Sequence, residues 1–140
     1  FASKWEFREL IDHDLVDYAR VDLCIAGGLT EGKKIAGWCE GHYIDMAVHN
    51  PLGPVSTAAC LHFNLAVPNF GVQEQPRRPG PGALASEIVG GQPVWEEGSL
   101  LPPTGPGLGL TFDREAAAAN PARLGELPRL RRPDGGFTNW

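Results

Sequence analysis

The sequence predicts an α/β fold in which short parallel strands are covered by helices. Over residues 1–75, helical segments alternate three times with short apolar runs. An ionisable residue falls at the end of each run, and much of the glycine and proline lies after residue 75. Repeated helix–strand units imply parallel strands joined by right-handed crossovers. An open doubly wound sheet and a closed barrel both satisfy this pattern.

The first unit begins with a helix that a capping box would start. Ser3 and Glu6 have the Ser-x-x-Glu spacing in which each side chain satisfies a free backbone N–H of the first turn. Apolar residues then recur at helical spacing, at Phe7, Leu10, Ile11 and Leu15. The run Val16–Leu23 is the first strand candidate.

The second and third units repeat this order. After a turn at Ala26-Gly27-Gly28, Thr30 can cap a helix whose inner face carries Ile35, Trp38 and Cys39. Tyr43–Val48 reads as a strand, and Pro54 suits the first position of the helix Val55–Ala66. Pro68 and Asn69 break that helix, and Phe70–Gln73 is the third strand.

The segment 76–140 differs in composition and is expected to be a return segment and tail. The stretch PRRPGP at 76–81 predicts a loop. Val94-Trp95 and Leu100-Leu101 flank a Glu-Glu-Gly turn and predict a small hairpin. Asp113 can cap an alanine-rich helix, Arg114–Ala119. We therefore expect residues 1–75 to form a partial barrel-like domain and residues 76–140 an irregular strap.

Composition excludes several classes of function. The net charge of −5 argues against nucleic acid as a partner, because phosphate binding needs a clustered positive field. No apolar run approaches the length of a membrane span, so no membrane partner is expected. The three cysteines lack metal-site spacing and sit among apolar neighbours, which favours buried free thiols and a reducing cytoplasm; they are Cys24, Cys39 and Cys60.

Three ionisable residues end the three predicted strands: Asp22, His49 and Glu74. Successive members are 27 and 25 residues apart, about one strand–helix unit each, so all three should stand on one rim of the sheet. Histidine carries protons near neutral pH, and Asp22 could accept one of its ring N–H groups and fix its tautomer. Glu74 could hydrogen-bond a substrate or a developing charge, and would need to be protonated to donate.

Structural roles for the same residues remain open at this point. A lone histidine is more often a satisfied structural residue than a catalyst. Asp22 could cap the turn at Gly27, and Glu74 could pair with Arg77 or Arg78. Spacing alone leaves the catalytic and the structural readings about equal.

Five ordered segments resemble the enolase superfamily, in its mandelate racemase/muconate lactonizing enzyme subgroup. VDLCIAGGLTE at 21–31 resembles the sixth-strand segment, and AVHNPLGP at 47–54 looks like the seventh-strand segment of galactonate dehydratase-like members. PNFGVQEQ at 68–75 is similar to the eighth strand. PGLG at 106–109 and RPDGGFTNW at 132–140 resemble the family's C-terminal return and tail.

The resemblance implies a fold and a set of roles. Strands six to eight of a (β/α)-barrel would lie in residues 1–75, and the strap would pack on a capping domain that this chain lacks. Asp22 and His49 match an Asp–His dyad in which His49 removes the proton α to a carboxylate of a sugar acid. Glu74 matches the acidic residue near the enolate oxygens. Such sites use Mg²⁺, whose carboxylate ligands in the family lie upstream of Phe1.

The reaction expected from the resemblance is dehydration of an aldonate, galactonate-like sugar acid, with this chain alone predicted inactive and without a Mg²⁺ site. Two departures from the family pattern are Val21, where the family often has proline, and Ile25, where dehydratases often have a polar residue. Racemisation or epimerisation on the same fold is one alternative, and a non-catalytic barrel fragment is another. The full-length enzyme is expected to form a homo-oligomer.

Overall fold

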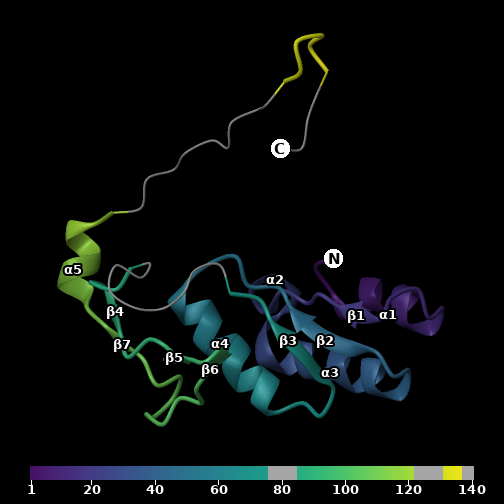
Figure 1. The fold of residues 1–140 in the computed structure, drawn as a ribbon, viewed down its shortest axis with the longest axis horizontal. Helices are drawn as coiled ribbons and strands as arrows, with labels where there is room; N and C mark the ends of the chain where they lie inside the picture. Colours follow the sequence, from purple (N-terminus) through teal and green to yellow (C-terminus); the bar gives the residue numbers. More distant parts are fainter. Residues whose placement is uncertain (76–84, 122–130, 137–140) are drawn as a thin grey trace.

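A computed structural model describes residues 1–75, 85–121 and 131–136 of the chain (Figure 1). Its largest sheet has three parallel strands in the order β1–β2–β3. These are β1 (Tyr18–Ala19), β2 (Asp45–Val48) and β3 (Phe70–Gln73). Consecutive parallel strands require crossovers, which the intervening helices provide. The predicted α/β class and the three parallel strands of residues 1–75 are therefore confirmed.

Four helices belong to this first part of the chain: α1 (Lys4–Asp12), α2 (Leu23–Ala26), α3 (Gly28–Gly41) and α4 (Pro54–Leu65). The Glu6 carboxylate accepts the backbone N–H of Ser3 at 2.9 Å, so the glutamate half of the predicted capping box forms. Pro54 occupies the start of α4, as predicted. No helix in the described ranges is long and apolar enough to cross a bilayer.

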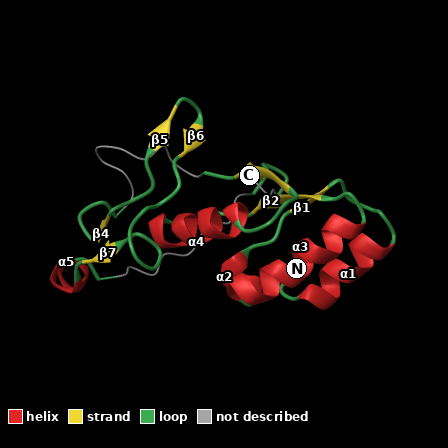
Figure 2. Cartoon of the chain, turned by 90° about the horizontal axis from the view of Figure 1, so that it is seen from below, coloured by secondary structure: helices red, strands yellow, loops and turns green. Residues whose placement is uncertain are grey.

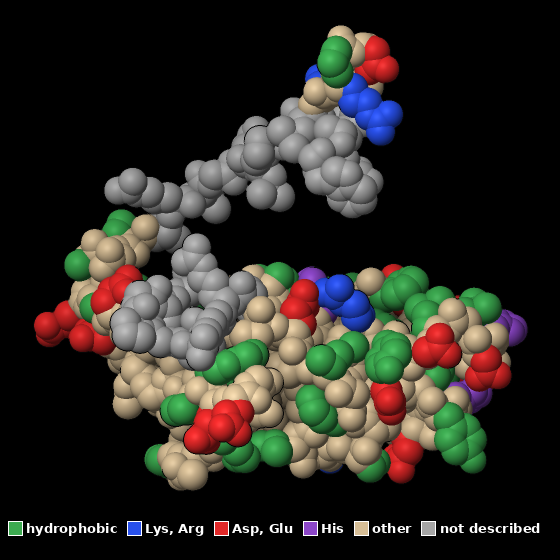
Figure 3. Space-filling view, in the orientation of Figure 1, with side chains coloured by type: hydrophobic (Ala, Val, Ile, Leu, Met, Phe, Trp, Pro, Cys, Tyr) green, Lys and Arg blue, Asp and Glu red, His purple; other side chains and the backbone are tan. Residues whose placement is uncertain are grey.

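The helices cover one face of the sheet, and no described helix covers the opposite, open face (Figure 2). Ala19, Met46 and Val48 point toward the helices and are buried, together with Ile35 and Phe63 from the helices themselves. On the open face and at the sheet edges, hydrophobic side chains are exposed (Figure 3), among them Tyr18, Phe70 and Val72. Parallel sheets are normally buried on both faces, so the open face is unusual for this class of sheet.

Three expectations for this region were wrong in detail. The strand predicted at Val16–Leu23 is shorter, because Leu23 already begins α2. Leu15 is exposed, since the left-handed backbone of Asp14 (φ 50°) ends the first helical segment before it. Trp38 is not on the inner face of α3: it is more than a third exposed and packs against Trp5 of α1, with 6.2 Å between ring centroids.

The remainder of the described chain consists of small elements. The predicted hairpin forms from β5 (Trp95–Glu96) and β6 (Ser99–Leu100), and Asp113 caps α5 (Arg114–Ala119) by accepting the N–H groups of Glu115 and Ala116. An additional antiparallel pair, β4 (Val89–Gly90) with β7 (Thr111–Phe112), was not predicted. The PRRPGP stretch lies outside the described residues.

Two glycines of α3 offer a matched test of the packing between α2, α3 and α4. A Cβ at Gly32 would lie 2.5 Å from Leu23 and 3.1 Å from Phe63, both buried, whereas a Cβ at Gly37 would meet nothing within 4 Å. We expect Gly32→Ala to destabilise the protein by about 1–3 kcal/mol through overpacking. Gly37→Ala should instead stabilise it by roughly 0.5–1 kcal/mol. Urea denaturation measures both, and equal effects would contradict this packing.

Candidate functional site

The carboxyl ends of the three parallel strands meet at one rim, and the three residues predicted there lie together. His49 follows β2, and its backbone N–H donates to the carbonyl of Val21 at 3.0 Å, which extends the pairing of β1 and β2 beyond the strands themselves. Nδ1 of His49 lies 3.0 Å from Oδ2 of Asp22. Glu74 follows β3, and its carboxylate accepts the backbone N–H of Asn50 at 2.7 Å.

Asp22 combines the structural role considered for it with contact to the histidine. Its Oδ1 accepts the backbone N–H of Cys24 at 2.8 Å and so caps α2, while Oδ2 faces His49. Asp22 therefore caps the start of α2. It does not cap the turn at Gly27, whose left-handed backbone (φ 104°) ends α2. Because both carboxylate oxygens are engaged and the side chain is buried, Asp22 holds the imidazole in a fixed orientation.

This geometry selects one tautomer of His49. An ionised carboxylate only accepts hydrogen bonds, so Nδ1 carries the hydrogen that faces Asp22. In the neutral ring Nε2 is then left with a free lone pair. About one third of the side chain is exposed, so the ring can be reached from solvent. A carboxylate that orients one ring nitrogen in this way leaves the other free to accept a proton.

Glu74 is held in its ionised form by its surroundings. Partial burial raises the pKa of this carboxyl, but the Asn50 N–H and the neighbouring Arg20 and His49 side chains lower it more, so the net pKa lies below the ordinary 4.5. Both carboxylate oxygens lie 2.9 Å from Nη2 of Arg20. Donation by Glu74 would need the protonated form, and the lowered pKa disfavours that form: at neutral pH Glu74 is an acceptor and a negative charge.

The lowered pKa of Glu74 predicts a pH-dependent difference in stability between the wild type and Glu74→Gln. A carboxyl whose folded-state pKa is depressed stabilises the fold above its unfolded pKa, and this contribution is lost as pH falls through the folded value. The wild-type advantage in free energy of unfolding should thus be full at about pH 7 and shrink below about pH 4.5. Urea denaturation across this range measures it. A pH-independent difference would contradict the assignment.

Arg20 is the residue at this rim that was not singled out from the sequence. Arg20 lies two positions before Asp22, and residues two apart in an extended segment share a face. This spacing could have predicted that Arg20 lies on the same face as Asp22. Arg20 pairs with Glu74. Arg77 and Arg78, which were also considered as partners of Glu74, lie outside the described residues. The rim thus presents a cation, an anion and an imidazole side by side.

His42 lies away from this arrangement, and the three cysteines differ in exposure. His42 pairs with Asp14 at 2.9 Å, at the loop side of α1 and α3. Cys39 and Cys60 are buried free thiols, as predicted, and burial raises the pKa of each to about 11. Cys24 is exposed, which corrects the expectation that all three thiols are buried. It lies in the first turn of α2, at the surface and not in the core.

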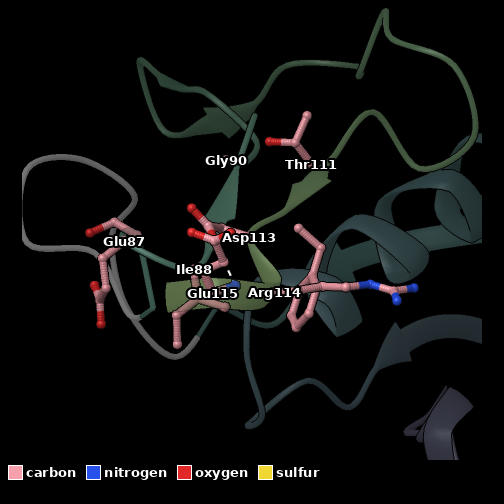
Figure 4. Close-up of a pocket in the computed structure, with 9 residues that line it drawn as sticks. Glu87, Ile88, Gly90, Thr111, Asp113, Arg114 and Glu115 are labelled. Carbon is pink, nitrogen blue, oxygen red and sulfur yellow. Dashed lines mark hydrogen bonds between the residues drawn. The ribbon is translucent and has the colours of Figure 1, made fainter. Parts of the chain in front are cut away.

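A hollow lies beside β4, β7 and the start of α5, apart from the rim residues (Figure 4). It is lined by Glu87, Thr111, Asp113, Arg114 and Glu115, and its acidic groups do not converge: Asp113 is occupied in capping the helix. Across the described ranges, no three His, Cys, Asp or Glu residues are grouped so that they could hold a metal ion. The described residues therefore do not fit a Mg²⁺ site, either here or at the rim.

Comparison with known proteins identifies the family to which this chain belongs. The profile of the family described as Enolase C-terminal domain-like matches residues 1–117. The chain belongs to this family. Over its whole length it is 37% identical to a D-mannonate dehydratase of Caulobacter vibrioides and 35% identical to a D-galactonate dehydratase family member of Streptomyces bingchenggensis. It spans only 34% of each of these relatives, about a third of their length.

Solved structures place the same fold within the enolase superfamily. An enolase from Pantoea ananatis with bound D-gluconate and Mg matches 94% of this chain and 32% of its own, at 33% identity and a TM-score of 0.81. A mandelate racemase/muconate lactonizing enzyme from Jannaschia sp. matches 90% of this chain and 31% of its own, at 30% identity and a TM-score of 0.80. The predicted membership of the mandelate racemase/muconate lactonizing enzyme subgroup, with galactonate dehydratase-like relatives, is thereby confirmed.

Proposed function

We propose that this chain is the C-terminal part of a sugar-acid dehydratase, with strands six to eight of its barrel in β1, β2 and β3. The observation that carries the proposal is the hydrogen bond from Nδ1 of His49 to the buried carboxylate of Asp22, at the rim where barrel enzymes place their catalytic groups. The relatives named as D-mannonate and D-galactonate dehydratases support the substrate class.

In the proposed reaction His49 is the base. Nε2 accepts the proton from the carbon α to the substrate carboxylate, and the electron pair of the broken C–H bond moves into the carboxylate to give an enediolate. Collapse of the enediolate expels the β-hydroxyl, which leaves as water after protonation, and the resulting enol becomes a 2-keto-3-deoxy acid. Arg20 and the ionised Glu74 lie beside the ring, where Arg20 can face an anionic substrate group.

Mg²⁺ is proposed as the cofactor of the whole enzyme. The Pantoea relative binds Mg together with D-gluconate, which supports this choice. Because the described residues do not fit a metal site, the ligands would have to come from elsewhere in the protein. What we assign to this chain is therefore limited to proton transfer at His49 and to binding at the rim, and by itself the 140-residue chain is proposed to be inactive.

Assays of the full-length protein with D-mannonate, D-galactonate and D-gluconate test the proposal. The expected result is formation of a 2-keto-3-deoxy acid from at least one of them, detected as its semicarbazone. Recovery of the C2 epimer without loss of water would instead support a racemase or epimerase. Turnover by the 140-residue chain alone would contradict the idea that it holds only part of the site.

A further inference from the structure

Asn50 follows His49 directly, yet its side chain has no exposed surface. A buried amide is costly unless it is hydrogen-bonded, so its contacts indicate what the position requires. Nδ2 donates to Oγ1 of Thr57 at 2.8 Å and to the carbonyl of Glu74 at 3.2 Å. The backbone N–H of Asn50 donates to the Glu74 carboxylate. One residue thus binds both the main chain and the side chain of Glu74.

The two peptide groups that flank the Cα of His49 are each held by a hydrogen bond, on opposite sides. On the β1 side, the His49 N–H donates to the Val21 carbonyl at 3.0 Å. On the β3 side, the Asn50 N–H donates to Glu74 at 2.7 Å. Together these two peptide groups link all three strands at the rim, and rotation of either would change the distance from the imidazole to Glu74.

The orientation of the Asn50 amide is determined by its neighbours. The single hydroxyl hydrogen of Thr57 is directed at the carbonyl of Gly53, at 3.0 Å, so its oxygen must accept from Asn50. The Glu74 carbonyl is also an acceptor. A reversed amide, or the carboxylate of an aspartate, would place oxygen against both of these acceptors. Only the two-donor end of an amide satisfies this position.

We propose that Asn50 is a positioning residue, which holds His49 and Glu74 at a fixed separation and is itself anchored through Thr57 to α4. The role is not that of a catalytic residue, because the side chain is buried and cannot touch a substrate. The inference rests on the proposed function of His49. The contacts of Asn50 with Glu74 can nevertheless be tested without measuring turnover.

The test compares Asn50→Ala, Asn50→Asp and Thr57→Val in the full-length protein with Ser56→Ala as the matched control. Ser56 is the neighbouring buried hydroxyl of α4, and within the described ranges its hydrogen-bonding partners are the thiols of Cys24 and Cys60. We expect the Asn50 variants to lower kcat by up to about 100-fold with a smaller change in KM, because misplacement of catalytic groups acts mainly on the chemical step. Thr57→Val should act in the same direction and less strongly, and Ser56→Ala should leave kcat unchanged.

A second readout is independent of activity. The side-chain carboxyl of Glu74, followed by carbon-13 NMR across pH, should titrate at higher pH in Asn50→Ala and Thr57→Val than in the wild type and in Ser56→Ala. This displacement in a protein that proves to have no dehydratase activity would support the positioning role and count only against the proposed reaction. Folded Asn50 and Thr57 variants with wild-type kcat and wild-type Glu74 titration would overturn the inference.

Discussion

Replacement of His49 by asparagine is expected to lower kcat for dehydration by about 100- to 10,000-fold, the range for loss of a positioned general base. Asparagine can keep a hydrogen bond to Asp22, so the rim should remain folded while the nitrogen that accepts the substrate proton is lost. Steady-state kinetics of the full-length protein on its best sugar acid measures the effect.

His42→Asn provides the matched control for this variant. His42 is also a histidine whose Nδ1 lies 2.9 Å from an aspartate, Asp14, but it stands away from the rim. We expect it to retain wild-type kcat. If both substitutions lowered kcat equally, the loss would reflect general damage to histidine–aspartate pairs, and His49 would have no special role.

Asp22→Asn should have an effect of similar size, for a reason that can be read from its two hydrogen bonds. The capping position at Cys24 requires an acceptor, so the new amide would turn its oxygen toward that N–H and its NH₂ toward Nδ1 of His49. Nδ1 would then have to accept, the hydrogen would move to Nε2, and the ring could not receive a proton there. A fall in kcat of about 100- to 10,000-fold is expected.

The capping of α2 by residue 22 should be little affected by this substitution, because asparagine and aspartate are about equally good at the start of a helix. The melting temperature of Asp22→Asn should therefore stay close to that of Asp113→Asn, the same change at the cap of α5, which should keep full activity. A large loss of stability in Asp22→Asn together with normal kcat in the surviving folded protein would show that Asp22 only caps α2.

The elements that the sequence predicted well are those with strong local signals. Pro54 and Asp113 mark helix starts by restricting φ or by accepting free N–H groups, and the run Phe70–Gln73 is bounded by a proline–asparagine break. The pairing of β4 with β7 carried no such signal. Each strand has two residues, and their partners lie about twenty positions apart, so only tertiary contacts define them.

The rim residues could be predicted as a group because the spacing of one strand–helix unit repeats. The spacing could not predict which charged groups surround each of these residues. The pairing of Glu74 with Arg20 joins residues 54 positions apart, and together with the Asn50 N–H it lowers the pKa of Glu74. The hydrogen bonds of Asn50 to Glu74 and Thr57 could not be predicted either, because an asparagine before a proline is typical of an ordinary turn.

The most direct test of the account follows the fate of the proton on the carbon α to the substrate carboxylate. A sugar acid that the full-length protein dehydrates would be labelled with deuterium at C2, and release of the label to solvent would be measured for the wild type and for His49→Asn. We predict release in step with product formation by the wild type, and release lowered by at least about 100-fold by His49→Asn. Release of the label by His49→Asn at the wild-type rate would contradict the assignment of His49 as the base.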